Sequence, residues 1–415
     1  MVLSYLHVES FKSIYRRNNM KLSRKICGIS PSLTLGINAL AKELMSQGKD
    51  VKNFGVGEPD FDTPEYIKDA AKEAMDKGYT KYTAVPGITE LRQAIAKRYE
   101  EECGIQTSFE EVVVSNGAKQ SLFNAFQAVV DPGDEVIIFS PYWLTYPELV
   151  KMADGVPVYV ETKAENNFEP LEKDIREKLT DRTQVILINN PSNPCGSIYS
   201  KKTLSMIADI AKERDLVIIS DEIYDCLIYD DDIYSIASLS EDAKERTIIV
   251  NGMSKSYAMT GWRMGYTISS PKIARAMSSY QSHSSSNPSS ISQYAALAAL
   301  TGPQDEKHHM EDVFKARAEL IYKLLTDIEG VKCVKPSGAF YVFPDISSAL
   351  GKSYNGVTIN DSVDFCEVLL KEKLVAAVPG KAFGGEGHIR LSYATSDEVI
   401  KEGVARLKEF VKELK

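Results

Sequence analysis

One lysine of the sequence stands apart from the other basic residues in its surroundings. Lys255 lies in NGMSKSYAMTGWRMGY (251–266), a segment of small and mostly neutral residues that continues the β-branched run TIIVN (247–251). Arg263 follows eight residues later. Burial among neutral residues lowers the pKa of a lysine amine and makes it a nucleophile for carbonyl compounds, whereas a planar guanidinium suits an anion. A surface lysine normally has charged or polar neighbours, so the segment predicts that Lys255 is buried.

Further polar residues follow other apolar runs of the sequence. EVVVS (111–115) leads into NGAKQ, where the free N–H groups of a helix start favour a phosphate. SPYW, NPSNPCG and DEIY follow the runs VIIF, VILIN and LVIIS. The candidates in these motifs are Gly117, Ala118, Lys119, Trp143, Asn193, Asp221 and Tyr224. A turn, a helix cap or core packing explains each one taken alone, so the functional interpretation depends on their convergence.

The elements that must bring these residues together alternate along residues 64–300. Seven short β-branched runs, apolar throughout, alternate with helical segments and predict a mostly parallel sheet with helices on both faces. Ligands bind at the carboxyl ends of strands in such sheets, where the candidates lie. Beyond residue 300, the runs VKCV, AFYVFP, KLVAAVPG and HIRLSYA alternate with helical segments and predict a smaller α+β domain.

The predicted organisation of the chain has four parts. Residues 1–19 are a tail or a misassigned start, residues 20–62 complete the smaller domain, residues 63–300 form the large α/β domain, and residues 301–415 form the rest of the smaller domain. A chain of 415 residues is long enough for two cores.

Composition argues against several classes of function. The net charge of -9 opposes binding to nucleic acid or anionic membranes, and no apolar run approaches the roughly 20 residues of a membrane span. Six scattered cysteines without CxxC spacing argue against a disulfide or zinc framework, and five histidines leave little for a metal site, so no metal is predicted. Reduced thiols indicate the cytoplasm as the expected compartment.

The candidate residues together match the requirements of one cofactor, pyridoxal 5'-phosphate (PLP). This cofactor needs a lysine amine for its aldehyde, an acid for its ring nitrogen, a flat apolar surface for its ring, donors for its phenolic oxygen and an anion site for its phosphate. Lys255, Asp221 and Trp143 are of the types required by the first three. The sequence therefore predicts a PLP site at the strand ends.

The same motifs resemble those of a known family. SNGAKQ, SPYW, NNPSNPCG, SDEIYD, SKSYAMTGWRMGY and HIRLSYA, in this order and spacing, look like the class I/II aminotransferases of PLP fold type I. GEPDFDTP and KYTAVPG are most similar to the prokaryotic-type aspartate aminotransferase branch, and the resemblance extends from about residue 22 to the end of the chain. It implies an α/β fold with a large domain, whose mostly parallel seven-stranded sheet is flanked by helices, and a smaller α+β domain.

The resemblance implies a role for each of the motif residues. Lys255 would form the Schiff base with PLP and then carry the proton of the substrate's α carbon, and Asp221 would pair with the ring nitrogen. Tyr224 would complete the catalytic set. The other implied cofactor contacts are Trp143 on the ring, Tyr224 and Asn193 at the phenolic oxygen, and Arg263, Ser254 and the backbone of Gly117, Ala118 and Lys119 at the phosphate.

Implied contacts also extend to a second subunit and to the substrate. Tyr82 of KYTAVPG would reach the phosphate of a second subunit, so a homodimer is implied. Arg390 would hold the substrate α-carboxylate as a planar fork, with help from the backbone N–H of Gly57, and Trp143 and Asn193 would border the substrate.

Two departures from the better-known aspartate aminotransferases affect these roles. Gly252 stands where many relatives have a phosphate-binding serine, and Ser254 would substitute in part. Ser282 stands where those enzymes have an arginine for the distal carboxylate. Lys119, helped by Ser32 and Thr34, is the replacement that the resemblance suggests, whereas a helix-start lysine that points to solvent is the competing interpretation.

The leading hypothesis is PLP-dependent transamination of L-aspartate with 2-oxoglutarate, through the pyridoxamine form of the cofactor, giving oxaloacetate and L-glutamate. Another amino acid or acceptor, including prephenate, an aromatic amino acid or alanine, is the first alternative. A PLP-dependent β-eliminating lyase would use the same lysine and aspartate.

A regulator built on this fold would need a DNA-binding domain. A nucleotide-binding module lacks its motif, because Gly55 and Gly57 form only a lone GxG and Ile346 occupies the first glycine position of a P-loop ending at Gly351.

Overall fold

A seven-stranded sheet forms the larger part of the molecule. The computed structural model describes residues 22–29, 33–229 and 233–415. In order across the sheet, the strands are β2 (Val112–Asn116), β8 (Met264–Ile268), β7 (Thr247–Gly252), β6 (Val217–Asp221), β5 (Thr183–Asn189), β3 (Glu135–Ser140) and β4 (Val156–Glu161). β8 is antiparallel to both of its neighbours, and all other neighbours are parallel. The predicted α/β fold is confirmed, and each of the seven apolar runs forms a strand.

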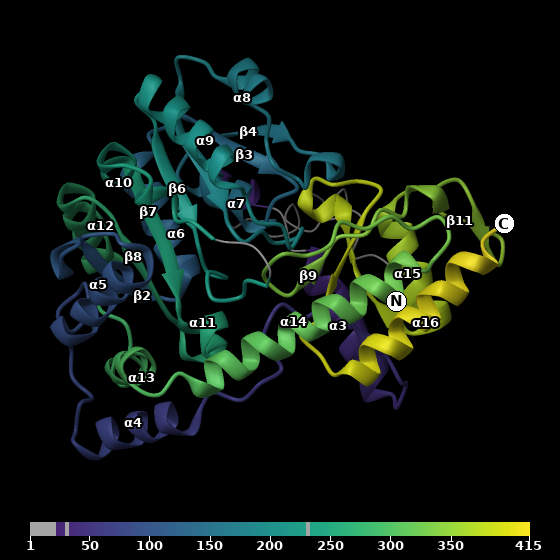
Figure 1. Ribbon diagram of the computed structural model, residues 1–415, viewed down its shortest axis with the longest axis horizontal. Coiled ribbons are helices and arrows are strands. Elements are labelled where there is room, and N and C mark those ends of the chain that lie inside the picture. The colour runs from purple at the N-terminus through teal and green to yellow at the C-terminus, as the bar shows by residue number, and fades with distance from the viewer. Residues whose placement is uncertain (1–21, 30–32, 230–232) are drawn as a thin grey trace.

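Helices cover both faces of this sheet (Figure 1). The side chains of Ile248 and Val250 on β7 pack towards one face, and Ile249 packs towards the other. The first face carries α6 (Ala118–Val129), α7 (Thr145–Met152) and α12 (Pro271–Ser284). The second face carries α4 (Glu65–Asp76), α5 (Thr89–Cys103), α8 (Glu172–Lys178), α9 (Lys201–Glu213), α10 (Glu241–Arg246) and α13 (Ser290–Thr301). Burial on both faces explains why the strands other than β4 are apolar throughout, whereas β4 lies at the edge of the sheet and is largely exposed.

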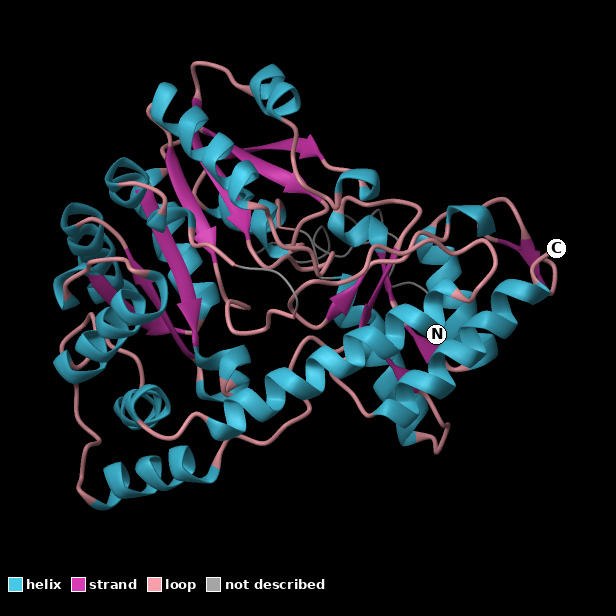
Figure 2. Ribbon diagram, viewed as in Figure 1, coloured by secondary structure: helices cyan, strands magenta, loops and turns pink. Residues whose placement is uncertain are grey.

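A second group of elements lies beside the sheet (Figure 2). Its strands are β13 (Val378–Pro379), β14 (Ile389–Ser392) and β9 (Tyr341–Val342), which form an antiparallel sheet in this order, and β1 (Lys52–Asn53), which pairs with β12 (Val375–Ala376) in parallel. The short strands β10 (Ser353–Tyr354) and β11 (Val357–Thr358) form a hairpin. The helices are α3 (Leu33–Ser46), α14 (Asp305–Thr326), α15 (Ser362–Lys373) and α16 (Asp397–Glu413), preceded by the single turn α2 (Arg24–Cys27). One hydrophobic core joins Ile37, Phe54, Phe314, Phe365 and Phe410.

The N-terminal segment therefore packs with C-terminal elements. The expectation of a strand at VKCV is wrong, because Lys332 makes only an isolated bridge with Asp345 and no strand forms there. The predicted domain boundaries stay a prediction, and residues 1–19 lie outside the described residues.

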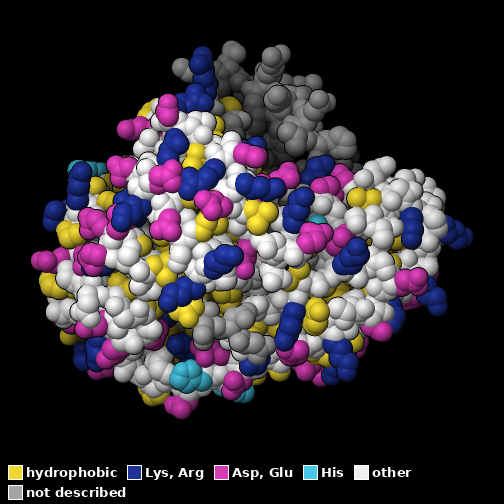
Figure 3. All heavy atoms as spheres, turned by 45° about the horizontal axis from the view of Figure 1, so that its top comes forward, with side chains coloured by type: hydrophobic (Ala, Val, Ile, Leu, Met, Phe, Trp, Pro, Cys, Tyr) yellow, Lys and Arg dark blue, Asp and Glu magenta, His cyan; other side chains and the backbone are white. Residues whose placement is uncertain are grey.

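The surface carries mixed charge. Lys and Arg side chains alternate with Asp and Glu over the face shown in Figure 3, so this face has no continuous basic patch for a polyanion. Among the helices of the described segments, none is long and apolar enough to cross a membrane.

Candidate active site

A cavity of about 490 Å³ lies between the carboxyl ends of the parallel strands and the antiparallel sheet. Side chains from β6, α6 and the segment after β7 line it, together with Tyr341 of β9 and Arg390 of β14. All of the predicted site residues except Gly117 and Tyr82 line this cavity. They are Gly57, Ala118, Lys119, Trp143, Asn193, Asp221, Tyr224, Ser254, Lys255, Arg263 and Arg390.

Lys255 enters the cavity from α11 (Met253–Ser256), the single turn that follows β7. Its Nζ donates a hydrogen bond to the backbone carbonyl of Gly57 (2.5 Å) and lies 5.7 Å from the ring centroid of Phe340. Burial lowers the pKa of Lys255 to about 8, and the opposing effect of Glu58 is smaller. About a tenth of this amine is therefore neutral at pH 7, far more than for an ordinary lysine, and the neutral form is the nucleophile.

Asp221 is the last residue of β6 and is only 3% exposed. Its Oδ2 accepts a hydrogen bond from the hydroxyl of Tyr146 (2.7 Å), and its Oδ1 accepts one from the backbone N–H of Ile223 (3.2 Å). Burial raises the pKa of Asp221 to about 6, and both hydrogen bonds oppose that rise. The carboxylate is thus poised to hold a protonated nitrogen in a site with little water.

The start of α6 forms an anion cradle with Arg263. Gly117 precedes α6 with φ of 83°, and a Cβ at this residue would overlap the guanidinium of Arg263, with 2.8 Å to its Cζ. Arg263 itself has φ of 54° and donates to the carbonyl of Thr260 (2.8 Å). Among the residues that the structure describes, no acidic side chain forms an ion pair with Arg263. A guanidinium beside the free N–H groups of a helix start fits a phosphate.

Arg390 is a buried cation that no carboxylate of the described chain neutralises. Its guanidinium is 4% exposed, donates to Oδ1 of Asn193 (3.1 Å) and to the carbonyl of Gly55 (3.0 Å), and lies 4.5 Å from the ring centroid of Tyr341. Its Nε has no hydrogen-bond partner in the described part of the chain. Burial lowers the pKa of Arg390. An unneutralised buried guanidinium is costly unless an anion binds to it, so this end of the cavity fits a carboxylate.

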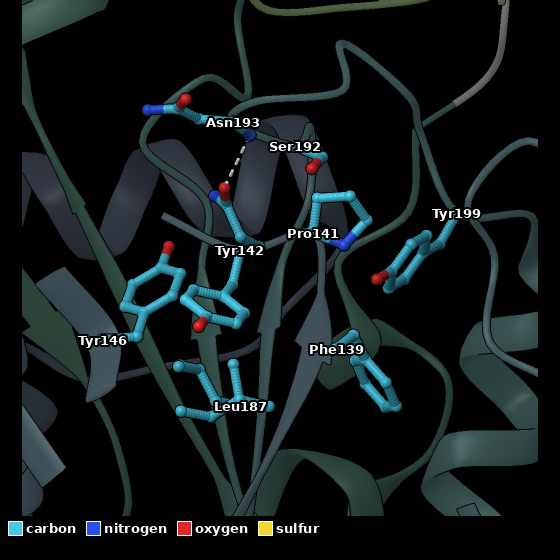
Figure 4. A pocket seen from close by; sticks show the side chains of 10 residues that line it. Phe139, Pro141, Tyr142, Tyr146, Leu187, Ser192, Asn193 and Tyr199 are labelled. Atoms are coloured by element: carbon cyan, nitrogen blue, oxygen red, sulfur yellow. Dashed lines mark hydrogen bonds between the residues drawn. The ribbon is translucent and has the colours of Figure 1, made fainter. Parts of the chain in front are cut away.

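Tyr224 and Asn193 border the same region. The hydroxyl groups of Tyr224 and Tyr341 lie 3.0 Å apart. A Cβ at Gly57 would lie 2.9 Å from the hydroxyl oxygen of Tyr341. The backbone N–H of Asn193 donates to Oδ1 of Asn189 (2.8 Å), the dashed line in Figure 4. Figure 4 looks into a second cavity, of about 10 Å³, which Tyr146, Asn189 and Asn193 share with the first. This space is too small for an amino acid and belongs to the packing behind the site.

Lys119 points into the cavity. Its Nζ lies 5.0 Å from the ring centroid of Trp143, which also lines the cavity. Burial lowers the pKa of Lys119, and the charge of Arg263 lowers it further. The side chain is nevertheless exposed, so its contact with a distal carboxylate stays a prediction. Of its two expected helpers, Ser32 lies outside the described residues, as does the side chain of Thr34.

The remaining predicted positions lie outside the cavity. The side chain of Tyr82 is 90% exposed. Ser282 is exposed on α12, where its hydroxyl donates to the carbonyl of Ser279 (2.7 Å). A Cβ at Gly252 would lie 2.6 Å from the carbonyl oxygen of Met264, so the pairing of β7 with β8 leaves no room for a serine there. Ser254 is buried and lines the cavity.

Several residues of the site escape prediction from the sequence. Tyr146 lies in α7, three residues after Trp143, and its hydroxyl donates to Asp221. Nothing in the sequence distinguishes this tyrosine from one that only packs in the core. Glu58, Tyr341 and Lys42 also line the cavity. Of these three residues, Glu58 alone belongs to a motif quoted above, GEPDFDTP, which is the one sequence signal that points to it.

The donor set meets the requirements of PLP. A nucleophilic amine, a buried carboxylate, the indole of Trp143 and an anion cradle surround one cavity. The glycine at residue 117 leaves the guanidinium of Arg263 free to approach the helix start. Within the described residues, no group of His, Cys, Asp and Glu side chains is placed to hold a metal ion.

Comparison with known proteins identifies the family. The model of the aminotransferase class I and II family matches residues 49–407. The chain is 45% identical to an aspartate aminotransferase of Bacillus subtilis, covering 94% of this chain and 99% of the relative. It is 44% identical to an aspartate/prephenate aminotransferase of Cereibacter sphaeroides, covering 94% and 98%. The solved structure of the Thermus thermophilus aspartate aminotransferase with maleate superposes with a TM-score of 0.88 at 42% identity, covering 94% of this chain and 99% of that one.

The chain therefore belongs to the class I and II aminotransferase family, and it is an aminotransferase. The resemblance expected from the sequence motifs is confirmed. Members of this family depend on PLP.

Proposed function

We propose that this aminotransferase binds PLP in the 490 Å³ cavity and transfers the amino group of L-aspartate to 2-oxoglutarate. The observation that carries the proposal is the grouping of three side chains around one cavity: the amine of Lys255, the buried carboxylate of Asp221 and the buried guanidinium of Arg390. Within the described residues, no carboxylate pairs with Arg390. The same cavity offers the anion cradle of α6 and Arg263.

Each of these residues would hold one part of the cofactor. Lys255 would bind its aldehyde carbon, Asp221 its ring nitrogen, Trp143 its ring, and Arg263 with the start of α6 its phosphate. When bound, PLP supplies an electron sink that stabilises negative charge at the α carbon of an amino acid.

The side chains of the chain would orient the amino acid and move its proton. Arg390 would bind the α-carboxylate, since its Nε is otherwise without a partner, and Asn193 holds the guanidinium in place. The Nζ of Lys255, with its pKa lowered to about 8, would take the proton from the α carbon as a general base. Tyr341 and Tyr224 would exclude water from this end of the cavity, because both are buried there.

An acidic substrate is supported by Lys119. This lysine lines the cavity beside Trp143 and is paired with no acidic residue in the described segments. An ammonium group in that position would attract a second carboxylate of the substrate. The printed names of the relatives agree, since they are aspartate aminotransferases and the Thermus thermophilus structure holds maleate, a dicarboxylate.

Prephenate as an amino acceptor is a second candidate, supported by the relatives named aspartate/prephenate aminotransferase. A homodimer and a cytoplasmic location belong to the proposal as well. The exposed Tyr82 supports the dimer, because its ring does not reach the cavity of its own chain. The cysteines Cys27, Cys103, Cys195, Cys226, Cys333 and Cys366 are free thiols, which supports a reducing compartment.

Turnover by the PLP-loaded protein tests the proposal. Wild-type protein is expected to convert L-aspartate and 2-oxoglutarate into oxaloacetate and L-glutamate, and Lys255→Ala is expected to lose this activity by at least about 10³-fold while it stays folded. Lys49→Ala, an exposed lysine outside the cavity, is the matched control and keeps full activity.

The products decide between the alternatives. Oxaloacetate formed from L-aspartate with prephenate but not with 2-oxoglutarate as the amino acceptor would contradict the leading substrate pair. Pyruvate, ammonia and a thiol released from an amino acid with a sulfur substituent on its β carbon, without a keto-acid acceptor, would instead indicate a β-eliminating lyase. Full activity of Lys255→Ala would refute the mechanism for every substrate.

A further inference from the structure

The cavity carries more positive charge than the roles described above use. Five basic side chains and two acidic ones line it, in a chain whose net charge is -9. The basic residues are Lys42, Lys119, Lys255, Arg263 and Arg390. A local excess of cations in an acidic chain marks a site for polyanionic ligands.

The two acidic residues leave most of this charge unneutralised. Glu58 accepts a hydrogen bond from Thr260 (2.8 Å), and Asp221 accepts one from Tyr146 (2.7 Å). The proposed roles assign Lys255, Arg263 and Arg390 to the reaction, the phosphate and the α-carboxylate. Lys119, which faces the cavity at Trp143, is assigned to the second carboxylate, and Lys42 is the basic lining residue that has no role.

Lys42 comes from a different part of the fold than Lys119. It lies on α3, where Ile37 and Ala41 are buried in the core while Lys42 is exposed and borders the cavity. α3 packs on β12 and β13, and Val378 of β13 pairs with Arg390. Lys42 thus borders the cavity from the part of the fold that carries Arg390, whereas Lys119 borders it from α6, so the two lysines reach one cavity from different elements.

The surroundings of Lys42 offer no structural use for its charge. Among the described residues, no carboxylate forms an ion pair with Lys42, although many exposed lysines of the chain have such a partner. The exposed ammonium group of Lys42 contributes little to the packing of α3. Ile37 and Ala41 anchor this helix in the hydrophobic core.

We propose that Lys42 is a second cationic contact for the distal carboxylate of a dicarboxylic substrate, and therefore a specificity-determining residue that acts with Lys119. The inference rests on the proposed function. Two ammonium groups from α3 and α6 share one carboxylate, which has acceptor positions for both. Because Lys42 is exposed, solvent and salt weaken its contribution.

The test compares a dicarboxylic with a monocarboxylic amino acid in the PLP-loaded protein. Lys42→Met is expected to lower kcat/KM for L-aspartate by about fivefold, through a higher KM, and to leave kcat/KM for L-alanine unchanged. Lys42→Arg keeps the charge and is expected to restore the wild-type preference. Lys49→Met removes an exposed charge outside the cavity and is expected to change neither substrate.

Ligand binding gives a readout that does not depend on turnover. By calorimetry, Lys42→Met is expected to weaken binding of succinate by a similar factor and to leave butyrate, the monocarboxylate of equal length, unaffected. The loss for succinate is expected to diminish as salt is raised.

The outcomes separate the inference from the function on which it rests. If wild-type protein turns over L-aspartate and Lys42→Met equals it in both assays, the inference is overturned and the proposed function stands. Equal losses for aspartate and alanine would also overturn it, because they indicate a general or structural effect. If wild-type protein neither turns over L-aspartate nor binds succinate, the proposed function and the inference are both overturned.

Discussion

The amine of Lys255 and the carboxylate of Asp221 lie in one cavity, where burial moves their pKa values in opposite directions. The pKa of Lys255 falls to about 8 and that of Asp221 rises to about 6. Burial is the largest cause in both cases, since it disfavours each charged form. The cofactor-free chain therefore keeps two groups in an unfavourable environment, which is a typical cost of a site built to bind another molecule.

This cost predicts that replacing Lys255 stabilises the cofactor-free protein. Below pH 8 the folded protein holds a charged lysine at a site that disfavours it, so Lys255→Met is expected to raise the free energy of unfolding by about 1–3 kcal/mol. Since the unfolded lysine keeps its proton to a higher pH, the wild type gains stability as pH rises from about 8 towards 10.5, and the advantage of Lys255→Met shrinks there.

Denaturant titrations of the two cofactor-free proteins at pH 6.5 and above pH 10 measure the difference in the free energy of unfolding directly. Above pH 10 we expect this difference to be roughly zero. A difference that is independent of pH would show that the lysine is not perturbed. Lys49→Met, whose side chain is exposed, serves as the control and is expected to match the wild type.

At the scale of elements, the site depends on strand ends that meet at one edge of the sheet. The runs that end at Asp221 and before Lys255 could be read from the sequence because buried parallel strands are apolar throughout. Their convergence could be predicted for the same reason, since ligands bind at the carboxyl ends of such strands. The antiparallel direction of β8 could not, because its apolar run looks like those of its parallel neighbours.

Contacts between distant segments were out of reach of the sequence patterns. Tyr146 reaches Asp221 from α7, and Lys42 borders the cavity from α3, but neither spacing nor residue type marks them. VKCV looks like a strand by composition, although only Lys332 makes a bridge. Such contacts depend on how helices and loops pack, which periodicity does not report.

The start of α6 offers the sharpest test at this scale. Gly117→Ala places a Cβ against the guanidinium of Arg263 and requires φ of 83°, which side chains rarely adopt. PLP affinity is expected to fall by at least about tenfold, because the cradle for the phosphate is displaced.

Gly104→Ala is the matched control for the cost of placing a side chain at a residue with positive φ. Gly104 ends α5 with φ of 67°, and a Cβ there meets nothing within 4 Å. This variant is expected to lose about 1 kcal/mol of stability and to bind PLP as the wild type does. Equal PLP affinity of Gly117→Ala and wild type, measured by fluorescence titration, would contradict the assignment of the cradle.

At the scale of the whole molecule, the proposed dimer depends on Tyr82. Its side chain is 90% exposed and lies outside the cavity. An exposed aromatic ring in a position that the family resemblance gives to a second subunit predicts a dimer, in which Tyr82 reaches the cofactor phosphate of its partner.

Light scattering of the PLP-loaded protein is expected to give twice the chain mass of 46.0 kDa. Tyr82→Phe is expected to weaken PLP binding by about fivefold, the loss of one hydrogen bond, without changing this mass. A monomer that binds PLP as tightly as the dimer would contradict the shared site. Tyr280→Phe, another exposed tyrosine, is the control.

The visible absorption spectrum of the PLP-loaded protein tests the central claim most directly. L-Aspartate is added without any keto acid, and 2-oxoglutarate is added afterwards. We expect the visible band of the bound cofactor to decrease with L-aspartate and to return with 2-oxoglutarate, because the amino group passes to the cofactor and then to the acceptor. A band that L-aspartate leaves unchanged, or a protein that takes up no PLP, would contradict the account.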